Sequence, residues 1–206
     1  RRLSNPWAGA KWYSLSTLGG SAQQLDITIV NALAGAAAAG IYGAVNRWIQ
    51  PMVVAIASFA SAAAPFLAEE SNLRSLRGPF LRAIWILSVP LVISVGVIFA
   101  APWLVVTLLG EQYAASAAVL QWLAAAMILN VFSQPLIVAL QSRRFDHLAA
   151  AILLASVGAQ LISVAALAPT LGAISAGVGF FVSQTLQVLG VGSCIGGIIL
   201  WRRKNS

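Results

Sequence analysis

Apolar residues run along this chain in stretches far longer than those of a soluble domain, and they predict helices that cross a membrane. A bilayer requires about 20 apolar residues per helix, which each stretch supplies. The pattern therefore predicts an all-α integral membrane fold. The expected spans are 12–33, 41–67, 80–109, 114–140, 148–168 and 171–201.

The first two spans form an expected hairpin around a small-residue turn at Gly35–Gly40. Its two arms hold Asp26 and Arg47, at nearly equal distances from the turn. At a rise of ~1.5 Å per residue, both lie roughly 10 Å below the same membrane face. A charge at that depth costs a few kcal/mol unless it is paired or faces a water-filled cavity. If the two charges pair, exchanging them is expected to restore folding in part.

Polar residues on the first arm gather on one half of the helix, opposite a stripe of leucines. They include Gln23, Gln24 and Asn31 beside Asp26. Lipid cannot satisfy so many amides, so this half must face protein or water. We predict that these four residues and Arg47 bind substrate or an ion. The alternative is that Asp26 is a packing acid, satisfied by Arg47 or by neighbouring hydroxyls.

Three amides in later spans, Asn130, Gln134 and Gln184, are secondary candidates for lining the same cavity. The other interpretation, which we favour for most such amides, is hydrogen bonding between helices, at about 1 kcal/mol each. Glycines are frequent in the last span and predict close helix packing there.

Charge sets the expected orientation. Residues are 60% hydrophobic and 8% charged, with a net charge of +7. The basic residues cluster at alternate connections, which the positive-inside rule places in the cytoplasm together with both termini. We expect a lead-in at 1–11, a six-helix lobe at 12–201 and a tail at 202–206, within a multi-pass protein. The clustered basic residues are Arg1, Arg2, Lys11, Arg74, Arg77, Arg82, Arg143, Arg144, Arg202, Arg203 and Lys204.

Reaction chemistry is not evident in the sequence. His147 is the sole histidine, without further metal ligands nearby, and there is no Walker A motif. The aromatic residues cluster near span ends rather than along a basic groove, which disfavours nucleic acid as a partner. We expect no catalytic residue, no metal site and no cofactor. A polar cavity in a helical bundle then indicates a carrier rather than an enzyme.

Several short patterns resemble those of bacterial polysaccharide flippases of the Wzx type, in the superfamily of multidrug, oligosaccharidyl-lipid and polysaccharide exporters. The similarity lies in Asp26 before an apolar run, then Gly40-Ile41-Tyr42 followed by Arg47, Pro65 after small residues, and the segment 108–126. The resemblance implies the carboxy-terminal lobe of a protein with about twelve spans, in the bacterial inner membrane. Because the chain starts with Arg, we expect a part of a longer protein or a processed form.

The resemblance further implies undecaprenyl-diphosphate-linked oligosaccharide as substrate, moved to the outer leaflet by alternating access between two lobes. It implies the missing amino-terminal lobe, the lipid bilayer and polysaccharide polymerase or ligase machinery as partners. Any coupling ion is expected to be Na+ or H+. Two alternatives stay open: a cation-coupled multidrug exporter of the same fold, and a non-transporting scaffold of a glycan-assembly complex.

Overall fold

The protein is a bundle of long α-helices, described here from a computed structural model that covers residues 7–69, 77–142 and 145–204. The all-α prediction is confirmed for these residues. The elements are α1 (Trp7–Ala22), the 3₁₀ turn η1 (Gln23–Leu25), α2 (Asp26–Glu69), α3 (Arg77–Leu109), the 3₁₀ turn η2 (Glu111–Tyr113), α4 (Ser116–Ser142), α5 (Asp146–Leu171) and α6 (Ile174–Lys204).

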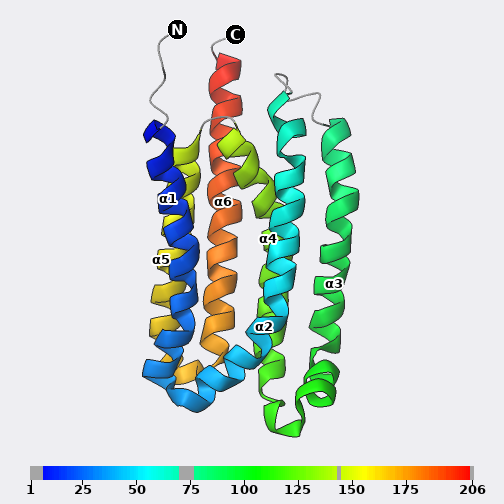
Figure 1. Ribbon diagram of the computed structural model, residues 1–206, viewed down its shortest axis with the longest axis vertical. Coiled ribbons are helices and arrows are strands. Elements are labelled where there is room, and N and C mark those ends of the chain that lie inside the picture. The colour runs from blue at the N-terminus through cyan, green and yellow to red at the C-terminus, as the bar shows by residue number, and fades with distance from the viewer. Residues whose placement is uncertain (1–6, 70–76, 143–144, 205–206) are drawn as a thin grey trace.

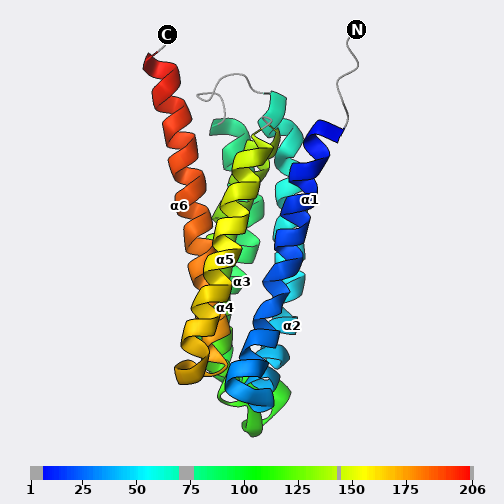
Figure 2. The same ribbon diagram turned by 90° about the vertical axis from the view of Figure 1, so that its left-hand side faces the viewer.

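The long helices run roughly along one axis, and the two ends of the chain lie at the same end of the bundle (Figure 1). Helix α4 packs against α2, α3 and α6, whereas α5 packs against α1, α2 and α6. The view turned by 90° places α1 and α2 on one side of the bundle and α6 on the other (Figure 2). Helix α4 is thus the central element, and α1 is held mainly by α5.

The predicted hairpin is present, and its reversal occurs at Gly35. This residue has φ 88° and ψ 168°, a conformation that side chains other than hydrogen rarely permit. Helix α1, η1 and the first turns of α2 lead to the reversal, and the rest of α2 leads away from it toward the opposite end (Figure 1). The first arm is not one continuous α-helix, however, because η1 interrupts it at Gln23–Leu25.

Five helices are long and apolar enough to cross a membrane within the described residues. The first of them, Thr17–Ser61, has 45 residues and contains both arms of the predicted hairpin, so the count differs from the six expected spans only there. Lengths and hydropathy of this kind identify a multi-pass membrane protein.

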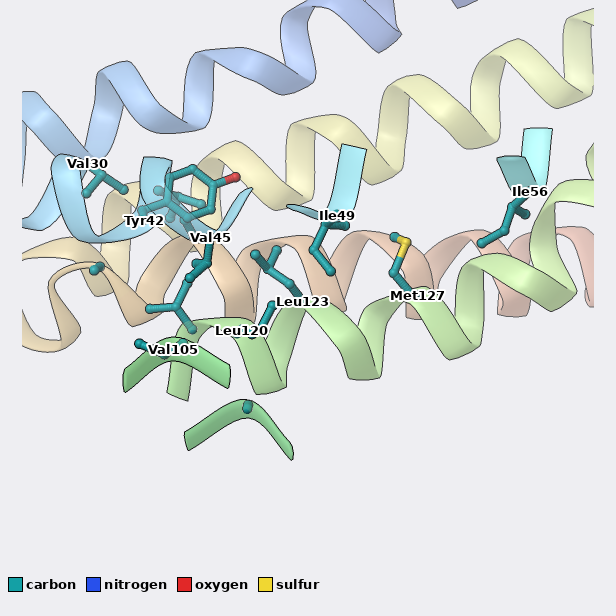
Figure 3. Packing of buried hydrophobic residues seen from close by; sticks show 14 of the residues in the cluster. Val30, Tyr42, Val45, Ile49, Ile56, Val105, Leu120, Leu123 and Met127 are labelled. Atoms are coloured by element: carbon teal, nitrogen blue, oxygen red, sulfur yellow. The ribbon is translucent and has the colours of Figure 1, made fainter. Parts of the chain in front are cut away.

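The core forms where α2, α3 and α4 meet. Val45 and Ile49 of α2 lie against Leu120 and Leu123 of α4, with Val105 of α3 beside them (Figure 3). All five side chains are buried. Because lipid is as apolar as these side chains, close packing rather than burial from water drives this association.

Glycines of α6 permit close contact with its neighbours, as the sequence predicted. A Cβ added at Gly177 would lie 2.8 Å from the Cβ of Trp122 on α4, and one at Gly179 would lie 2.5 Å from Cγ2 of Val164 on α5. By contrast, Gly192 has no neighbour within 4 Å of such an atom. A Cβ at Gly190, in the middle of α6, would lie 3.2 Å from Cγ2 of Ile152 on α5. Close packing therefore holds from the start of α6 to about its middle rather than for its whole length (Figure 1).

Apart from Arg47, the basic residues of the described helices lie at the end of the bundle where α1 begins and α6 ends. Lys11 lies in the first turns of α1, Arg77 and Arg82 in those of α3, and Arg202–Lys204 in the last turn of α6. The clusters at 1–2, at Arg74 and at 143–144 lie outside the described residues.

Candidate functional site

Asp26 lies at the junction of η1 and α2 and is almost fully buried, with 4% of its surface exposed. Its Oδ2 accepts a hydrogen bond from the hydroxyl of Tyr42 at 2.6 Å and another from Nε2 of Gln160 at 3.1 Å. Its Oδ1 accepts from the backbone N–H of Ile27 at 2.6 Å. Both carboxylate oxygens are therefore engaged.

The local sequence is consistent with the change from α-helix to a 3₁₀ turn at Gln23–Leu25, directly before Asp26. An aspartate side chain can bond neighbouring backbone groups and so competes with the regular helical ladder. Here the Asp26 carboxylate takes the N–H of the next residue, directly after the tighter turn of η1. The carboxylate lies at the end of this interruption and is bonded by Tyr42 and Gln160.

The network joins three parts of the chain. Asp26 belongs to the first arm of the hairpin, Tyr42 to the second arm and Gln160 to α5. Gln160 extends the network, because its Oε1 accepts from Nε2 of Gln23 at 2.9 Å. Figure 3 shows the Tyr42 ring beside Val30 and Val45 in the apolar cluster. Buried polar links of this kind contribute about 1 kcal/mol each inside a membrane bundle.

Arg47, the other predicted charge, is not part of this network. Its side chain is exposed on α2, and within the described residues Asp26 bonds to Tyr42 and Gln160 instead of to Arg47. The packing-acid alternative thus holds in one respect, since a neighbouring hydroxyl satisfies Asp26. Because Asp26 and Arg47 do not pair, exchanging the two charges would not rebuild an ion pair, and the partial rescue of folding is no longer expected.

The remaining residues of the predicted hairpin site separate into two groups. Gln23 is half-buried and reaches Asp26 through Gln160. Gln24 and Asn31 are exposed, as is Thr28 between them. A role in binding stays a prediction for all of them.

The secondary candidates gather between α4 and α6. Nδ2 of Asn130 donates to Oε1 of Gln184 at 3.0 Å, and both side chains are buried. Gln134, one turn further along α4, is half-buried. Nε2 of Gln121 donates to the carbonyl oxygen of Ile98 on α3 at 3.0 Å. The interhelical interpretation is therefore confirmed for Asn130 and Gln184, whereas cavity lining stays a prediction.

Sequence reasoning missed two partners of Asp26. Tyr42 was noted only within a family pattern, and Gln160 was not singled out. A usable signal existed for Gln160, because it is the sole amide of the predicted span 148–168. An amide alone in an apolar span needs a partner inside the bundle.

Within the described ranges, no three His, Cys, Asp or Glu side chains come together to hold a metal ion. Asp26 is a single carboxylate with three hydrogen-bond donors already around it. The arrangement can hold the hairpin against α5, and it leaves the exposed polar side of the hairpin to meet other molecules.

Comparison with known proteins gives one assignment. No curated protein and no solved structure matched the chain. Residues 8–118 match the family described as Polysaccharide biosynthesis protein. The match covers α1, α2, α3 and the first turn of α4, with Asp26, Tyr42 and Arg47 inside it and Gln160 outside it. It spans more than half of the 206 residues. The chain therefore belongs to the polysaccharide biosynthesis protein family.

Proposed function

We propose that this chain forms one lobe of a non-enzymatic membrane transporter that flips polyprenyl-diphosphate-linked oligosaccharide from the cytoplasmic to the outer leaflet. The proposal joins membership of a polysaccharide biosynthesis family to a bundle of long apolar helices. The observation that carries it is the exposed polar side of the α1–α2 hairpin, which lies within a stretch apolar enough to cross a membrane.

The first arm has three distinct sides. Gly19, Asp26 and Val30 are buried against the bundle. Two leucines are exposed on a second side, Leu18 at 65% and Leu25 at 50%. Gln24, Thr28 and Asn31 are exposed on a third side, since helical steps of about 100° place them roughly opposite the buried residues. Leucines suit lipid, but amides there would lack partners. The third side therefore needs water or protein.

The second arm continues this polar side. Tyr42, Val45 and Ile49 of α2 are buried, whereas Arg47 and Gln50 are exposed. Helices α1 and α2 lie on the same side of the bundle, away from α6 (Figure 2). A guanidinium suits the diphosphate of a lipid-linked sugar, because it can donate paired hydrogen bonds to phosphate oxygens. The neighbouring amides suit sugar hydroxyls.

We place this polar side against a second lobe, across a water-filled route near the middle of the membrane. Carriers built from structural repeats bind substrate at such an interface and alternate access by rocking one repeat against the other. In this arrangement the sugar and diphosphate pass along the hairpin, and the polyprenyl tail stays in lipid. Polymerase or ligase machinery would receive the product at the outer face.

The proposed orientation has six spans and both termini in the cytoplasm of a bacterial inner membrane. The reversal at Gly35 supports counting Thr17–Ser61 as two spans. The basic residues of α1, α3 and α6 at one end of the bundle support placing that end in the cytoplasm. The same orientation puts Asp26 and Arg47 in the outer half of the membrane.

Asp26 has a positioning role in this proposal, because its hydrogen bonds tie the route-lining hairpin to α5. If transport is coupled to Na+ or H+, Asp26 is the candidate for binding that ion, because it is the one acidic residue in the stretch 17–61. A coupling ion would have to compete with Tyr42 and Gln160 for the carboxylate.

The test uses the complete natural protein in proteoliposomes that hold a labelled polyprenyl-diphosphate oligosaccharide in one leaflet. Wild type should transfer label to the opposite leaflet, and Arg47→Gln should slow transfer at least tenfold. Val92→Ala is the matched control, because Val92 is 68% exposed on the apolar surface of α3. It should transfer at the wild-type rate.

Two outcomes would reject the flippase proposal, and a third would reject only the part that the hairpin plays in it. Absence of transfer by wild type, with uptake of a cationic dye driven by an ion gradient, would indicate a drug exporter. Absence of both activities would favour a scaffold. Unimpaired transfer by Arg47→Gln would show that the substrate does not pass along the polar side of the hairpin.

A further inference from the structure

A second polar cluster lies between α4 and α6, apart from the hairpin network. It consists of Asn130 and Ser133 on α4 and Ser183, Gln184 and Gln187 on α6. Each of the five side chains is at least 98% buried. Oε1 of Gln184 accepts from Nδ2 of Asn130 at 3.0 Å. The single hydroxyl proton of Ser133 can be donated to the same Oε1 at 3.4 Å or to the carbonyl oxygen of Asn130 at 3.3 Å.

Three oxygens of this cluster have no hydrogen-bond partner among the described protein groups: Oδ1 of Asn130, Oγ of Ser183 and Oε1 of Gln187. Native proteins rarely leave buried polar atoms unpaired, and the exceptions point to a bound water or ion. The requirement is stronger within a membrane, where bulk water cannot reach the atoms. Three such atoms on two packed helices indicate an occupant.

The chemistry of the three oxygens restricts what the occupant can be. The two carboxamide oxygens can only accept hydrogen bonds, whereas the serine hydroxyl can donate one. A water molecule donates two hydrogen bonds and accepts others, so one water has the two donors and the acceptor that these three atoms require. The five members of the cluster are all uncharged, which matches a neutral occupant better than a cation that would be buried without a counter-charge.

We propose that the cluster binds an ordered water molecule, which bridges α4 to α6 through Asn130, Ser183 and Gln187. Buried waters typically make about three hydrogen bonds to groups that would otherwise be unpaired. Together with the hydrogen bonds among Asn130, Ser133 and Gln184, this water would give every member of the cluster a hydrogen-bond partner. This inference does not depend on the transported substrate, because it concerns packing within the bundle.

The first test is the sign of a change in melting temperature, measured on the complete natural protein in nanodiscs. With a bound water, Ser183→Ala and Gln187→Met each remove a partner, and Tm should fall by about 2–4 °C. In a dry cluster each variant would delete an unpaired atom, and Tm should rise. The matched control is Ser193→Ala, at an exposed position of α6, which should leave Tm unchanged. A Tm that rises or stays level in both cluster variants overturns the proposal.

The second test distinguishes water from a cation. Wild-type melts in NaCl, KCl and choline chloride should coincide, whereas an increase specific to Na+ and absent from Ser183→Ala would replace water by a sodium site. A density map of the wild-type protein that resolves ordered water should show a peak within hydrogen-bond distance of all three oxygens. A map of that quality without the peak would also overturn the proposal.

Discussion

Replacing Tyr42 by Phe removes one hydroxyl and leaves the aromatic ring. That hydroxyl donates to Oδ2 of Asp26 at 2.6 Å, and the ring packs in the apolar cluster of α2, α3 and α4. Tyr42 itself is 2% exposed, so neither water nor lipid can replace the lost donor. The substitution therefore isolates one hydrogen bond across the hairpin.

The expected loss of stability is about 1–2 kcal/mol, the range for a buried hydrogen bond in a membrane bundle. It is not larger, because the Asp26 carboxylate keeps its hydrogen bonds from Gln160 and from the backbone of Ile27. For a chain of this size, such a loss lowers Tm by about 2–8 °C.

Thermal unfolding of the complete natural protein in nanodiscs measures the effect. Tyr113→Phe is the matched control, since Tyr113 is only half-buried at η2. Adding Gln160→Leu tests the network: both residues bond to the same oxygen, so the double variant should differ from the sum of the singles. If Tyr42→Phe melts within about 1 °C of wild type, which is less than 1 kcal/mol, then Asp26 does not hold the two arms together.

Three further substitutions test the fold. Gly179→Ala should lower stability by about 1–3 kcal/mol in thermal melts. Its new methyl group would lie 2.5 Å from Val164 and 3.0 Å from the carbonyl oxygen of Gln160. The control Gly192→Ala, at a position with open space around it, should not lower stability. Gly35→Ala should lower stability by about 1–3 kcal/mol through backbone strain at φ 88°, while Gly40→Ala, with no neighbour within 4 Å, should be neutral or stabilising. Gln184→Leu should lower Tm by about 2–8 °C, because it removes the acceptor shared by Asn130 and Ser133. Equal melting of each pair, or an unchanged Gln184→Leu, would contradict these assignments.

The sequence could predict the hairpin, and could single out the acid within it, because both are local features. Charges within apolar runs are rare, so Asp26 and Arg47 stand out without knowledge of the fold. Gly35 marks the reversal because it lies among small residues between two apolar arms. Lipid requires each apolar run to be helical, which made the fold class predictable.

The partners of Asp26 were beyond sequence reasoning, because they depend on how helices rotate against one another. Gln160 is 134 residues from Asp26, and only the packing of α5 against the hairpin joins them. The sequence also could not show which side of α2 is exposed. The Ala, Val and Ile residues of α2 are spread around several sides of the helix. The sequence therefore shows no single apolar stripe that would identify the side packed against α4. Equal depth for Asp26 and Arg47 therefore suggested a pair that helix rotation prevents.

The separation of the two charges has a physical advantage for a carrier. A charge that must meet a passing anion has to stay exposed to the route, whereas a charge that fixes the shape of the hairpin has to be buried and fully bonded. Arg47 is exposed on α2, and Asp26 is held by Tyr42, Gln160 and the backbone of Ile27. Had they paired, substrate binding at Arg47 would have required breaking the contact that anchors the arm. Because Asp26 is bonded elsewhere, Arg47 in the proposed flippase would bind and release a phosphate group while the hairpin keeps its position against α5.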